Sequence, residues 1–249
     1  MREKSCPKIA IIGYGSMGRE VESIAKAKEY NITNIFEIDN PIQKNVDYDF
    51  DVAIDFSYPN EVVQNVETLC QLKKHIVVGT TGWYDQKDRI QGIVEQAGIG
   101  MIYATNFSIG MRMFFKIIED AAKLVDKISD YDVFLHEIHH RHKKDSPSGT
   151  AQSLAGIIID NVNSKKSIVT DSINGEIRPD QLHVSSTRGG EVMGYHKLFL
   201  DSAADTIELT HRAKNRSGFA AGAISAANWI NGRTGFYEFS EMIENIWLA

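Results

Sequence analysis

The chain has few cysteines, no long apolar run and no excess of positive charge. Its 249 residues include only Cys6 and Cys70, which lack a metal-site spacing, so we expect reduced thiols and no disulfide framework. No apolar stretch reaches about 18 residues, which argues against a membrane-spanning helix. A formal net charge of −6 argues against nucleic acid or an anionic membrane as the main partner. The opening residues, MREKSCPK, contain no apolar segment of a secretion signal, and together these features predict a cytoplasmic protein.

One segment, EIHHRHKKDSPSGTA at positions 137–151, stands out from this acidic background. It continues an apolar strand pattern, yet it is crowded with imidazoles and cations whose burial would be costly. The following Pro147–Thr150 predicts a turn into a helix, with Ser148 or Thr150 as cap and free backbone N–H groups able to hold an anion. A cationic patch beside such a turn predicts a small ligand with carboxylate groups.

The first 107 residues repeat a short apolar run, a turn and a helical period, which is typical of a parallel sheet with crossover helices. The pattern therefore predicts a Rossmann-type α/β domain. We expect strands at 9–12, 34–37, 51–56, 75–78 and 100–104, helices near 16–30, 59–73 and 84–97, and a loop over 40–50.

After residue 106 the rhythm changes, and strands follow one another without helices between them. We expect helices at 110–125 and 150–162, a strand from 131 into the histidine cluster, and strands at 183–187, 194–200 and 206–211. This order predicts an α+β domain with a mixed, largely antiparallel open sheet. A helix at 218–230 and an amphipathic segment at 238–247 are expected to return to the first domain. Residues 1–107 and 216–249 would then form one domain and 108–215 the other.

A glycine-rich loop lies between the first strand and the first helix. Its sequence, Gly13-Tyr14-Gly15-Ser16-Met17-Gly18, matches G-x-G-x-x-G in the context that indicates a dinucleotide site. Gly13 permits the tight turn, Gly15 lets the backbone approach a pyrophosphate, and Gly18 allows helix and strand to pack closely.

An acidic residue after the second strand should hold the adenosine ribose. Glu37 and Asp39 both stand near the right place, and we favour Glu37 because it ends the strand. No Arg or Lys follows before Lys44 to receive a 2′-phosphate, which favours NADH over NADPH.

Two further segments follow strands, at the sheet edge where α/β proteins bind ligands. Gly79-Thr80-Thr81-Gly82 follows the fourth strand, and Ala104-Thr105-Asn106-Phe107 follows the fifth. Their hydroxyl, amide and backbone groups suit a nicotinamide carboxamide, although the first segment alone is equally typical of a plain turn.

Taken in order, the glycine loop, GTTG, ATNFS and the 137–151 segment resemble the dihydrodipicolinate reductase family of lysine and diaminopimelate biosynthesis. The resemblance runs end to end and includes Asp55-Phe56-Ser57, Arg188-Gly189-Gly190 with Gly194 and His196, and the stretch from His211 to Ala223. It implies an NAD(P)H-dependent reductase that converts 4-hydroxy-tetrahydrodipicolinate to tetrahydrodipicolinate with loss of water. It also implies a small dicarboxylate substrate, no metal, and a homotetramer formed through the sheet of the second domain.

The resemblance further implies roles for individual residues. His139 would be the proton donor and Lys143 the second catalytic cation. The substrate carboxylates would be bound by His140, Ser148, Gly149 and Thr150. The nicotinamide cofactor would be bound by Gly13, Tyr14, Gly15, Ser16, Met17, Gly18, Glu37, Gly79, Thr80, Thr81, Ala104, Thr105, Asn106 and Phe107.

Strand geometry limits how the histidines can cooperate. Adjacent residues of a regular strand face opposite sides, so His139 and His140 can both serve the substrate only if the strand ends or bends near them. We expect His142, His183 and His196 to be structural.

The chain departs from the family pattern near the expected adenosine and phosphate end. The family often has a basic residue inside the glycine loop, and some members have an Arg soon after the ribose acid and another in the turn after the Asp-Phe-Ser/Thr motif. Here the loop has no cation before Gly18, and Ile38 and Tyr58 stand at the other two places. All three changes remove positive charge, which weakens the case for NADPH.

Three other functional classes fit parts of the sequence. A zinc hydrolase should have metal-binding histidines spaced i, i+4 on a helix, and the group His139-His140-Arg141-His142 lacks that spacing and has no cysteine nearby. A dinucleotide-binding redox sensor would need neither the histidine cluster nor its anion-binding turn. Another two-domain NAD-dependent dehydrogenase of small amino or keto acids would share the cofactor half but lack the SPSGTA string, and it is the main alternative.

Overall fold

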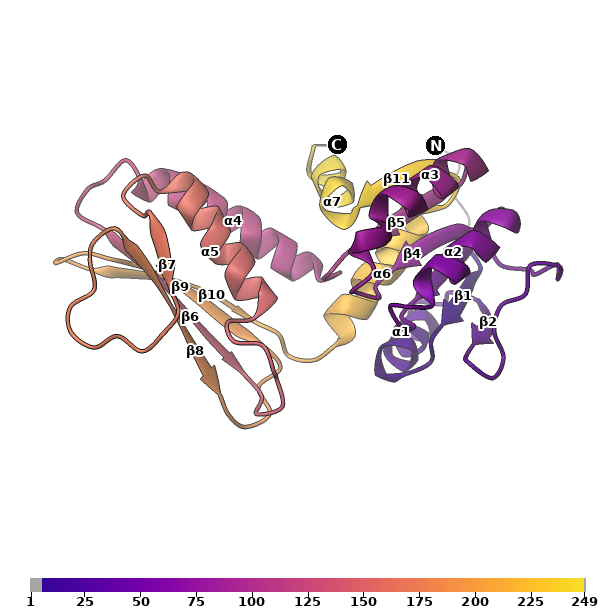
Figure 1. Cartoon of the computed structure of the whole chain (residues 1–249), viewed down its shortest axis with the longest axis horizontal. Coiled ribbons are helices and arrows are strands. Elements are labelled where there is room, and N and C mark those ends of the chain that lie inside the picture. The colour runs from indigo at the N-terminus through magenta and orange to yellow at the C-terminus, as the bar shows by residue number, and fades with distance from the viewer. Residues whose placement is uncertain (1–5, 249) are drawn as a thin grey trace. The chain divides into compact units, whose positions relative to one another are not determined.

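The computed structural model describes residues 6–248 and divides the chain into two compact units. The first runs to Ile109 and resumes at Arg216, and the second is Gly110–Asn215. The first unit therefore carries both the indigo and the yellow ends of the colour scale in Figure 1. None of the helices in residues 6–248 has an apolar stretch long enough to span a bilayer.

The first unit is built on a parallel sheet with the strand order β11-β5-β4-β3-β1-β2. Its strands are β1 Ile9–Ile12, β2 Ile32–Phe36, β3 Val52–Asp55, β4 His75–Val78, β5 Gly100–Tyr103 and β11 Gly235–Glu238. The Rossmann-type prediction is confirmed, and each strand expected in the first 107 residues is present. The sequence did not indicate β11, because its four residues lie directly before an amphipathic helix and lack an alternating pattern.

Helices cover both faces of this sheet, so alternate strand residues enter two separate cores. Ile9 and Ile11 pack with α1, α6 and α7, whereas Ala10 and Ile12 pack with α2 and α3. The helices are α1 Ser16–Ala27, α2 Val62–Gln71, the 3-10 turn η1 Tyr84–Gln86, α3 Lys87–Ala97, α6 Ser217–Ile230 and α7 Phe239–Trp247. Strand β11 pairs parallel with β5 and forms one edge of this sheet.

The second unit has a mixed sheet with the order β10-β9-β6-β8-β7. Its elements are α4 Ile109–Val125, β6 Asp132–His139, α5 Gly149–Asn161, β7 Ser167–Val169, β8 Gln181–Arg188, β9 Tyr195–Asp201 and β10 Thr206–Arg212. Strand β9 pairs antiparallel with β6 and β10, whereas β8 pairs parallel with β6 and β7. The mixed sheet was expected, but its antiparallel character is limited to one half, because the short β7 adds a parallel edge that the sequence pattern did not indicate.

Helices α4 and α5 lie on one face of this sheet (Figure 1). Val133 and Leu135 of β6 pack against them, and the same face continues through Glu137 to His139, all four being buried. The strand ends at His139. The expected break between His139 and His140 is therefore present, and it frees His140 from the alternation of the strand.

Candidate active site

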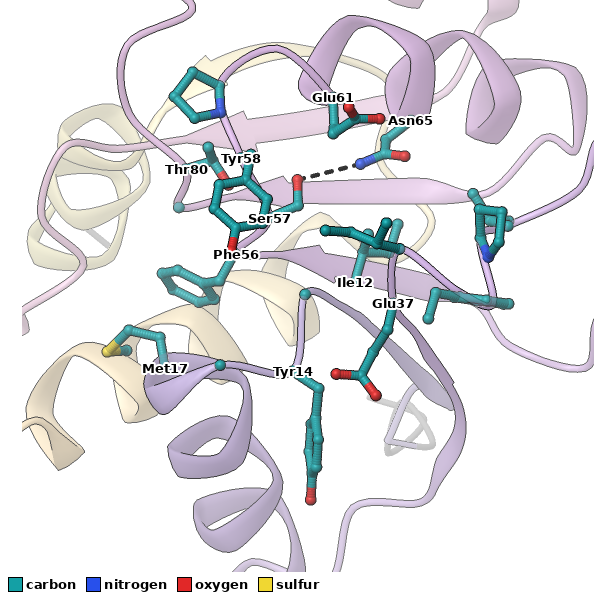
Figure 2. Close-up of a pocket in the computed structure, with 18 of the residues that line it drawn as sticks. Ile12, Tyr14, Met17, Glu37, Phe56, Ser57, Tyr58, Glu61, Asn65 and Thr80 are labelled. Atoms are coloured by element: carbon teal, nitrogen blue, oxygen red, sulfur yellow. Dashed lines mark hydrogen bonds between the residues drawn. The ribbon is translucent and has the colours of Figure 1, made fainter.

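A cleft of about 900 Å³ opens at the carboxyl ends of β1 to β4 in the first unit (Figure 2). Of the residues expected to bind a dinucleotide, those in the cleft lining are Gly13, Tyr14, Gly15, Ser16, Met17, Glu37, Gly79, Thr80 and Thr81. Ile38, Asp39 and Tyr58 also line it, as do Asn65 and its neighbours at the start of α2. Sequence reasoning missed the contribution of α2, because a helix start without a motif gives no sign of which loop it faces.

The glycines of the β1–α1 loop leave room for a phosphate group. Gly13 has φ +84°, and a Cβ there would lie 2.5 Å from the carbonyl oxygen of Phe56. A Cβ on Gly18 would lie 2.2 Å from the carbonyl oxygen of Gly13, so Gly18 packs behind the loop and does not line the cleft. Gly15 has no neighbouring atom within 4 Å of its missing Cβ, and it begins α1 without a side-chain cap. The open helix start beside Gly15 fits a dinucleotide pyrophosphate.

The acid at the end of β2 stands in a tight turn. Glu37 and Asn40 exchange backbone hydrogen bonds of 3.2 and 3.1 Å, which leaves Ile38 and Asp39 at the tip, with Ile38 78% exposed. Among the described residues, the Glu37 carboxylate has no hydrogen-bonding or ionic partner and lines the cleft (Figure 2). It is therefore free to accept hydrogen bonds from ribose hydroxyls.

One cation, Arg19, lies beside the glycine loop, although the sequence predicted no positive charge there. The Arg19 guanidinium is 5.0 Å from the centre of the Tyr14 ring, and its Nε donates a 3.3 Å hydrogen bond to the Tyr14 carbonyl. The expectation of a loop without positive charge considered only positions before Gly18. Arg19 follows that glycine directly, and the first turn of α1 brings it back to the loop.

A buried carboxylate, Asp55, holds the base of the cleft together. Its side chain is fully buried and accepts hydrogen bonds from Ser57 N at 2.8 Å, Asn65 Nδ2 at 3.0 Å and Thr80 Oγ1 at 3.1 Å. Burial raises the pKa of Asp55, and the neutral hydrogen-bond donors of Ser57, Asn65 and Thr80 oppose that shift only in part. This carboxylate fixes Thr80, whose segment was expected to meet the nicotinamide.

The segment after β5 does not line this cleft. Ala104 and Phe107 are buried, and the Phe107 ring packs against Phe239 with the ring centres 4.9 Å apart. The Asn106 side chain accepts a 2.8 Å hydrogen bond from Ser108 N. The segment lies beside the end of β4 through the β4–β5 pairing, but much of it serves the core.

The second unit gathers its polar residues around Glu137, which is also fully buried. Glu137 Oε1 accepts hydrogen bonds from Ser148 N at 2.9 Å, Ser186 Oγ at 2.8 Å and Arg188 Nη2 at 2.7 Å. Its other oxygen, Oε2, lies 3.2 Å from His139 Nδ1 and 3.7 Å from His196 Nε2. Burial acts to raise the pKa of Glu137, but the contacts with His139, Ser148 and Arg188 outweigh it and lower that pKa. The carboxylate is therefore charged.

His196 was expected to be structural, and the fold brings it to this cluster. The β6–β9 register places it opposite Glu137, and its ring is 5.1 Å from that of His139 in an edge-on arrangement. Burial and the neighbouring His139 lower the pKa of His196 to about 3, so its ring is neutral near pH 7. Only the strand pairing reveals this position, and no local pattern in the sequence encodes it.

The chain turns after His139 and lays the cationic residues beside the start of α5. Lys143 Nζ lies 2.8 Å from Asp145 Oδ1, and this contact lowers the pKa of Asp145. His140 is anchored through its backbone N–H, which donates to the Val192 carbonyl at 2.7 Å. Arg141 pairs with Glu191 at the surface, and His142 is exposed.

Ser148 caps α5, accepting a 3.2 Å hydrogen bond from Ala151 N, and is only 2% exposed. Its hydroxyl is thus committed to the helix and to His196, 3.3 Å away. Gly149 and Thr150 begin the helix and are the more open members of the group expected to bind the substrate. The carboxylate-binding capacity of this turn therefore rests mainly on the helix start and on the nearby Lys143.

Glu137, His139 and His196 each offer one atom within 4.8 Å of the others, a spacing that a metal ion could use. The Arg188 guanidinium, 2.7 Å from the same carboxylate, opposes a second cation there. The arrangement suits proton transfer better than metal binding.

Two family models together match most of the chain. The model described as dihydrodipicolinate reductase, N-terminus, matches residues 7–107, and the model of the C-terminus matches residues 110–243. The chain belongs to the dihydrodipicolinate reductase family. The resemblance drawn from the sequence motifs is confirmed.

Curated relatives of this reductase family agree along the whole length. The 4-hydroxy-tetrahydrodipicolinate reductase of Christiangramia forsetii is 36% identical over 240 residues, covering 96% of this chain and 98% of the relative. The enzyme of the same name from Archaeoglobus fulgidus is also 36% identical, over 262 residues, covering 95% and 100%.

Solved structures of similar fold include a dipicolinate-bound dihydrodipicolinate reductase from Paenisporosarcina sp. TG-14. It matches with a TM-score of 0.74 at 22% identity, covering 95% of this chain and 99% of that one. An amine dehydrogenase from Mycobacterium smegmatis matches with a TM-score of 0.57 at 9% identity, covering 96% and 97%. Because a differently named dehydrogenase shares the fold, the family assignment rests on sequence and not on architecture.

Proposed function

We propose that this chain catalyses the NAD(P)H-dependent reduction of 4-hydroxy-tetrahydrodipicolinate to tetrahydrodipicolinate with loss of water, in lysine and diaminopimelate biosynthesis. The observation that carries the proposal is the cluster of His139, Lys143 and the α5 start, held around a buried Glu137, in a chain 36% identical to curated reductases of that name. It supplies what a dicarboxylate needs, namely an acid, a cation and open helix N–H groups.

The bound nicotinamide cofactor would supply a hydride. Gly13 and Gly15 leave the space that its pyrophosphate needs, and Glu37 has a free carboxylate for the ribose. Thr80, held by Asp55, lies at the end of β4, where the nicotinamide would be received. We propose the same cofactor role for the remaining residues expected from the sequence, namely Tyr14, Ser16, Met17, Gly18, Gly79, Thr81, Ala104, Thr105, Asn106 and Phe107.

When hydride reaches the substrate ring, negative charge develops toward its nitrogen, and a nearby acid must donate a proton. We assign that donation to His139, because imidazole titrates near neutral pH. Lys143 would stabilise the developing charge, exchanging its contact with Asp145 for one with the substrate. His140, Ser148, Gly149 and Thr150 would bind the carboxylates, Ser148 chiefly by holding the helix start in place.

We propose NADH as the preferred cofactor. The free carboxylate of Glu37 favours ribose hydroxyls and repels a 2′-phosphate, and Ile38 occupies a position where an arginine would bind that phosphate. Arg19 beside Tyr14 reduces the preference, because it places one positive charge next to the loop.

We further propose that the protein is a cytoplasmic homotetramer assembled through the second unit. Within that unit, the sheet face opposite α4 and α5 carries Phe134 and Phe199, stacked with ring centres 4.6 Å apart. Both rings are half-buried, and no helix of the second unit covers this face of the sheet. Such a face is suited to contact between subunits. Sedimentation of the purified chain tests this assembly, and a monomer at micromolar concentration would contradict it.

The test of function is oxidation of NADH and NADPH with the condensation product of pyruvate and aspartate semialdehyde as substrate. We expect rapid turnover that falls about 100-fold or more in His139→Gln, because general acids contribute about that much. The matched control is His142→Gln, the same change at an exposed histidine three positions along the motif. If NADH binds but only small amino or keto acids support turnover, the chain is instead a dehydrogenase of that class.

A further inference from the structure

The buried carboxylate of Glu137 serves the reaction as well as the fold. Its two oxygens have different surroundings. Oε1 is saturated by the three donors from Ser148, Ser186 and Arg188. Oε2 is buried without a hydrogen-bond partner, and nitrogen atoms of two imidazole rings lie 3.2 and 3.7 Å from it.

His139 shows the complementary pattern. Its Nδ1 is buried and also lacks a hydrogen-bond partner, and it lies 3.2 Å from Glu137 Oε2 without being aligned as a hydrogen bond. A buried donor and a buried acceptor that are both unsatisfied at this distance destabilise the site until they pair. Hydrogen bonds in ligand-free active sites are often misaligned and tighten when the substrate binds.

At the opposite edge of the His139 ring, the Nε2 atom has space because the neighbouring residue is a glycine. A Cβ on Gly194 would lie 3.3 Å from His139 Nε2, so the glycine leaves space at that nitrogen. Two groups lie beside the ring, Glu137 on β6 and the neutral His196 on β9. Two cations stand behind them: Arg188 on β8 pairs with Glu137, and Lys143 in the following loop acts electrostatically on His196.

We propose that Glu137 is a positioning residue, whose Oε2 holds a proton on Nδ1 of His139 and thereby makes Nε2 the nitrogen that delivers the proton to the substrate. This inference rests on the proposed role of His139. In the imidazolium both nitrogens carry hydrogen. The Nε2–H bond breaks as hydride adds to the ring carbon and a new N–H bond forms on the substrate. The imidazole then remains neutral with its hydrogen on Nδ1, facing the carboxylate.

The isosteric change Glu137→Gln reverses this arrangement. If the Gln oxygen keeps the three donors of Oε1, its NH2 group points at Nδ1 and requires a lone pair there. The neutral ring must then carry its hydrogen on Nε2. We expect kcat to fall about 100-fold, since the general acid is lost, while the KM for NADH stays within about twofold because the cofactor binds elsewhere in the chain.

The decisive measurement is the tautomer of neutral His139, from 15N spectra of protein labelled in the histidine rings and recorded at alkaline pH. The signal is assigned by its loss in His139→Gln. We expect Nδ1–H in the native chain and Nε2–H in Glu137→Gln. Nε2–H in the native chain overturns the proposal, and this result needs no substrate and does not depend on the folding of Glu137→Gln.

A control separates positioning from simple support of the fold. Ser186→Ala removes one donor to Oε1 and leaves Oε2 untouched. We expect the native tautomer and a kcat within about threefold of the native value. If Ser186→Ala loses as much activity as Glu137→Gln, Glu137 acts only through the fold. If His139→Gln keeps its activity, the proposed function of His139 fails, whereas the tautomer result stands by itself.

Discussion

Each unit of this protein contains a fully buried carboxyl group, and the pKa values of the two groups are shifted in opposite directions. Asp55 at the base of the dinucleotide cleft has only neutral partners, and burial raises its pKa. Glu137 in the second unit has an arginine and two imidazoles as partners, and its pKa is lowered. Both carboxylates are fully buried, so the partners decide the direction of the pKa shift.

The difference fits the proposed function. A dinucleotide would bring its own negative charge, and a raised pKa of Asp55 beneath the cleft goes in the direction of less repulsion. In the second unit a proton would pass from His139 to a dianionic substrate, and the charged carboxylate of Glu137 would stabilise the imidazolium that donates it. The first site would depend on backbone shape, and the second on paired charges.

The largest loss of stability is expected when the ion pair between Arg188 and Glu137 is removed. Arg188→Ala leaves the buried Glu137 without its cation, and we expect the free energy of unfolding of the second unit to fall by about 3–5 kcal/mol. This free energy is measured by urea titration, with hydrogen exchange of the β6 and β9 amides as the signal for unfolding of the second unit. The matched change around Asp55, Asn65→Ala, removes the hydrogen bonds of a neutral amide to Asp55 and Ser57 and should cost about 1–2 kcal/mol. Equal losses in the two variants would contradict the comparison.

The backbone conformation of the glycine loop should not tolerate an added methyl group. Gly13→Ala places a Cβ 2.5 Å from the Phe56 carbonyl at a positive φ. We expect NADH affinity, measured by calorimetry, to fall about 30- to 100-fold, corresponding to about 2–3 kcal/mol. Gly92→Ala in α3 meets no atom within 4 Å and serves as control. It should leave affinity unchanged and stabilise the helix slightly.

These two sites also show what the sequence can and cannot reveal. The glycine loop, Glu37 and the GTTG segment were found directly because their residues are close in sequence and their spacing follows from one turn. The cluster around Glu137 joins β6, β8 and β9, and its partners Ser186, Arg188 and His196 come together only through strand register. Register depends on the whole sheet, so His196 was expected to be structural and Glu137 had no expected role.

Short elements were missed for a related reason. Strands β7 and β11 have three and four residues, too few for periodicity to register, and their place is set by neighbouring strands already present. Helix α1 ended earlier than its apolar pattern suggested, at Ala27, because Glu29 takes a positive φ of 60°. The order of strand and helix patterns along the chain was sufficient to predict the fold class. The ends of individual elements depend on the backbone conformation of single residues, which the patterns do not indicate.

Acid should affect the two units in opposite directions. The folded pKa of His196 is about 3, below its ordinary 6.5, so its stabilising contribution is complete above pH 6.5 and declines by about 1.4 kcal/mol per pH unit as pH falls toward 3. Glu137, also lowered, adds to this loss below its ordinary 4.5. Asp55 is raised from its ordinary 3.8, so protonating it favours the folded first unit.

Hydrogen exchange at pH 7 and pH 4.5, corrected for intrinsic rates, tests this difference. We expect β6 and β9 to lose protection in acid while β1 and β3 retain it. In His196→Gln the loss should be smaller. Equal acid sensitivity of both sheets would contradict the opposite pKa shifts of Asp55 and the Glu137–His196 cluster.

The smallest effect concerns cofactor choice. Under the proposed cofactor assignment, Glu37→Gln removes a charged acceptor for ribose hydroxyls, and we expect the ratio of kcat/KM for NADH to kcat/KM for NADPH to fall about tenfold. Asp39→Asn, two residues along the same turn, is the matched control. A larger change in Asp39→Asn would assign the ribose contact to Asp39.

The pairing of β11 with β5 has a consequence for the order of synthesis on the ribosome. The first unit needs α6 for its core and β11 for its sheet edge, and both are translated after the whole second unit. The second unit is continuous and can complete its sheet as soon as Arg212 has emerged. The order of translation thus allows the Glu137 cluster to form before the Rossmann sheet is complete, because β5 has no partner on its outer edge until β11 has been synthesised.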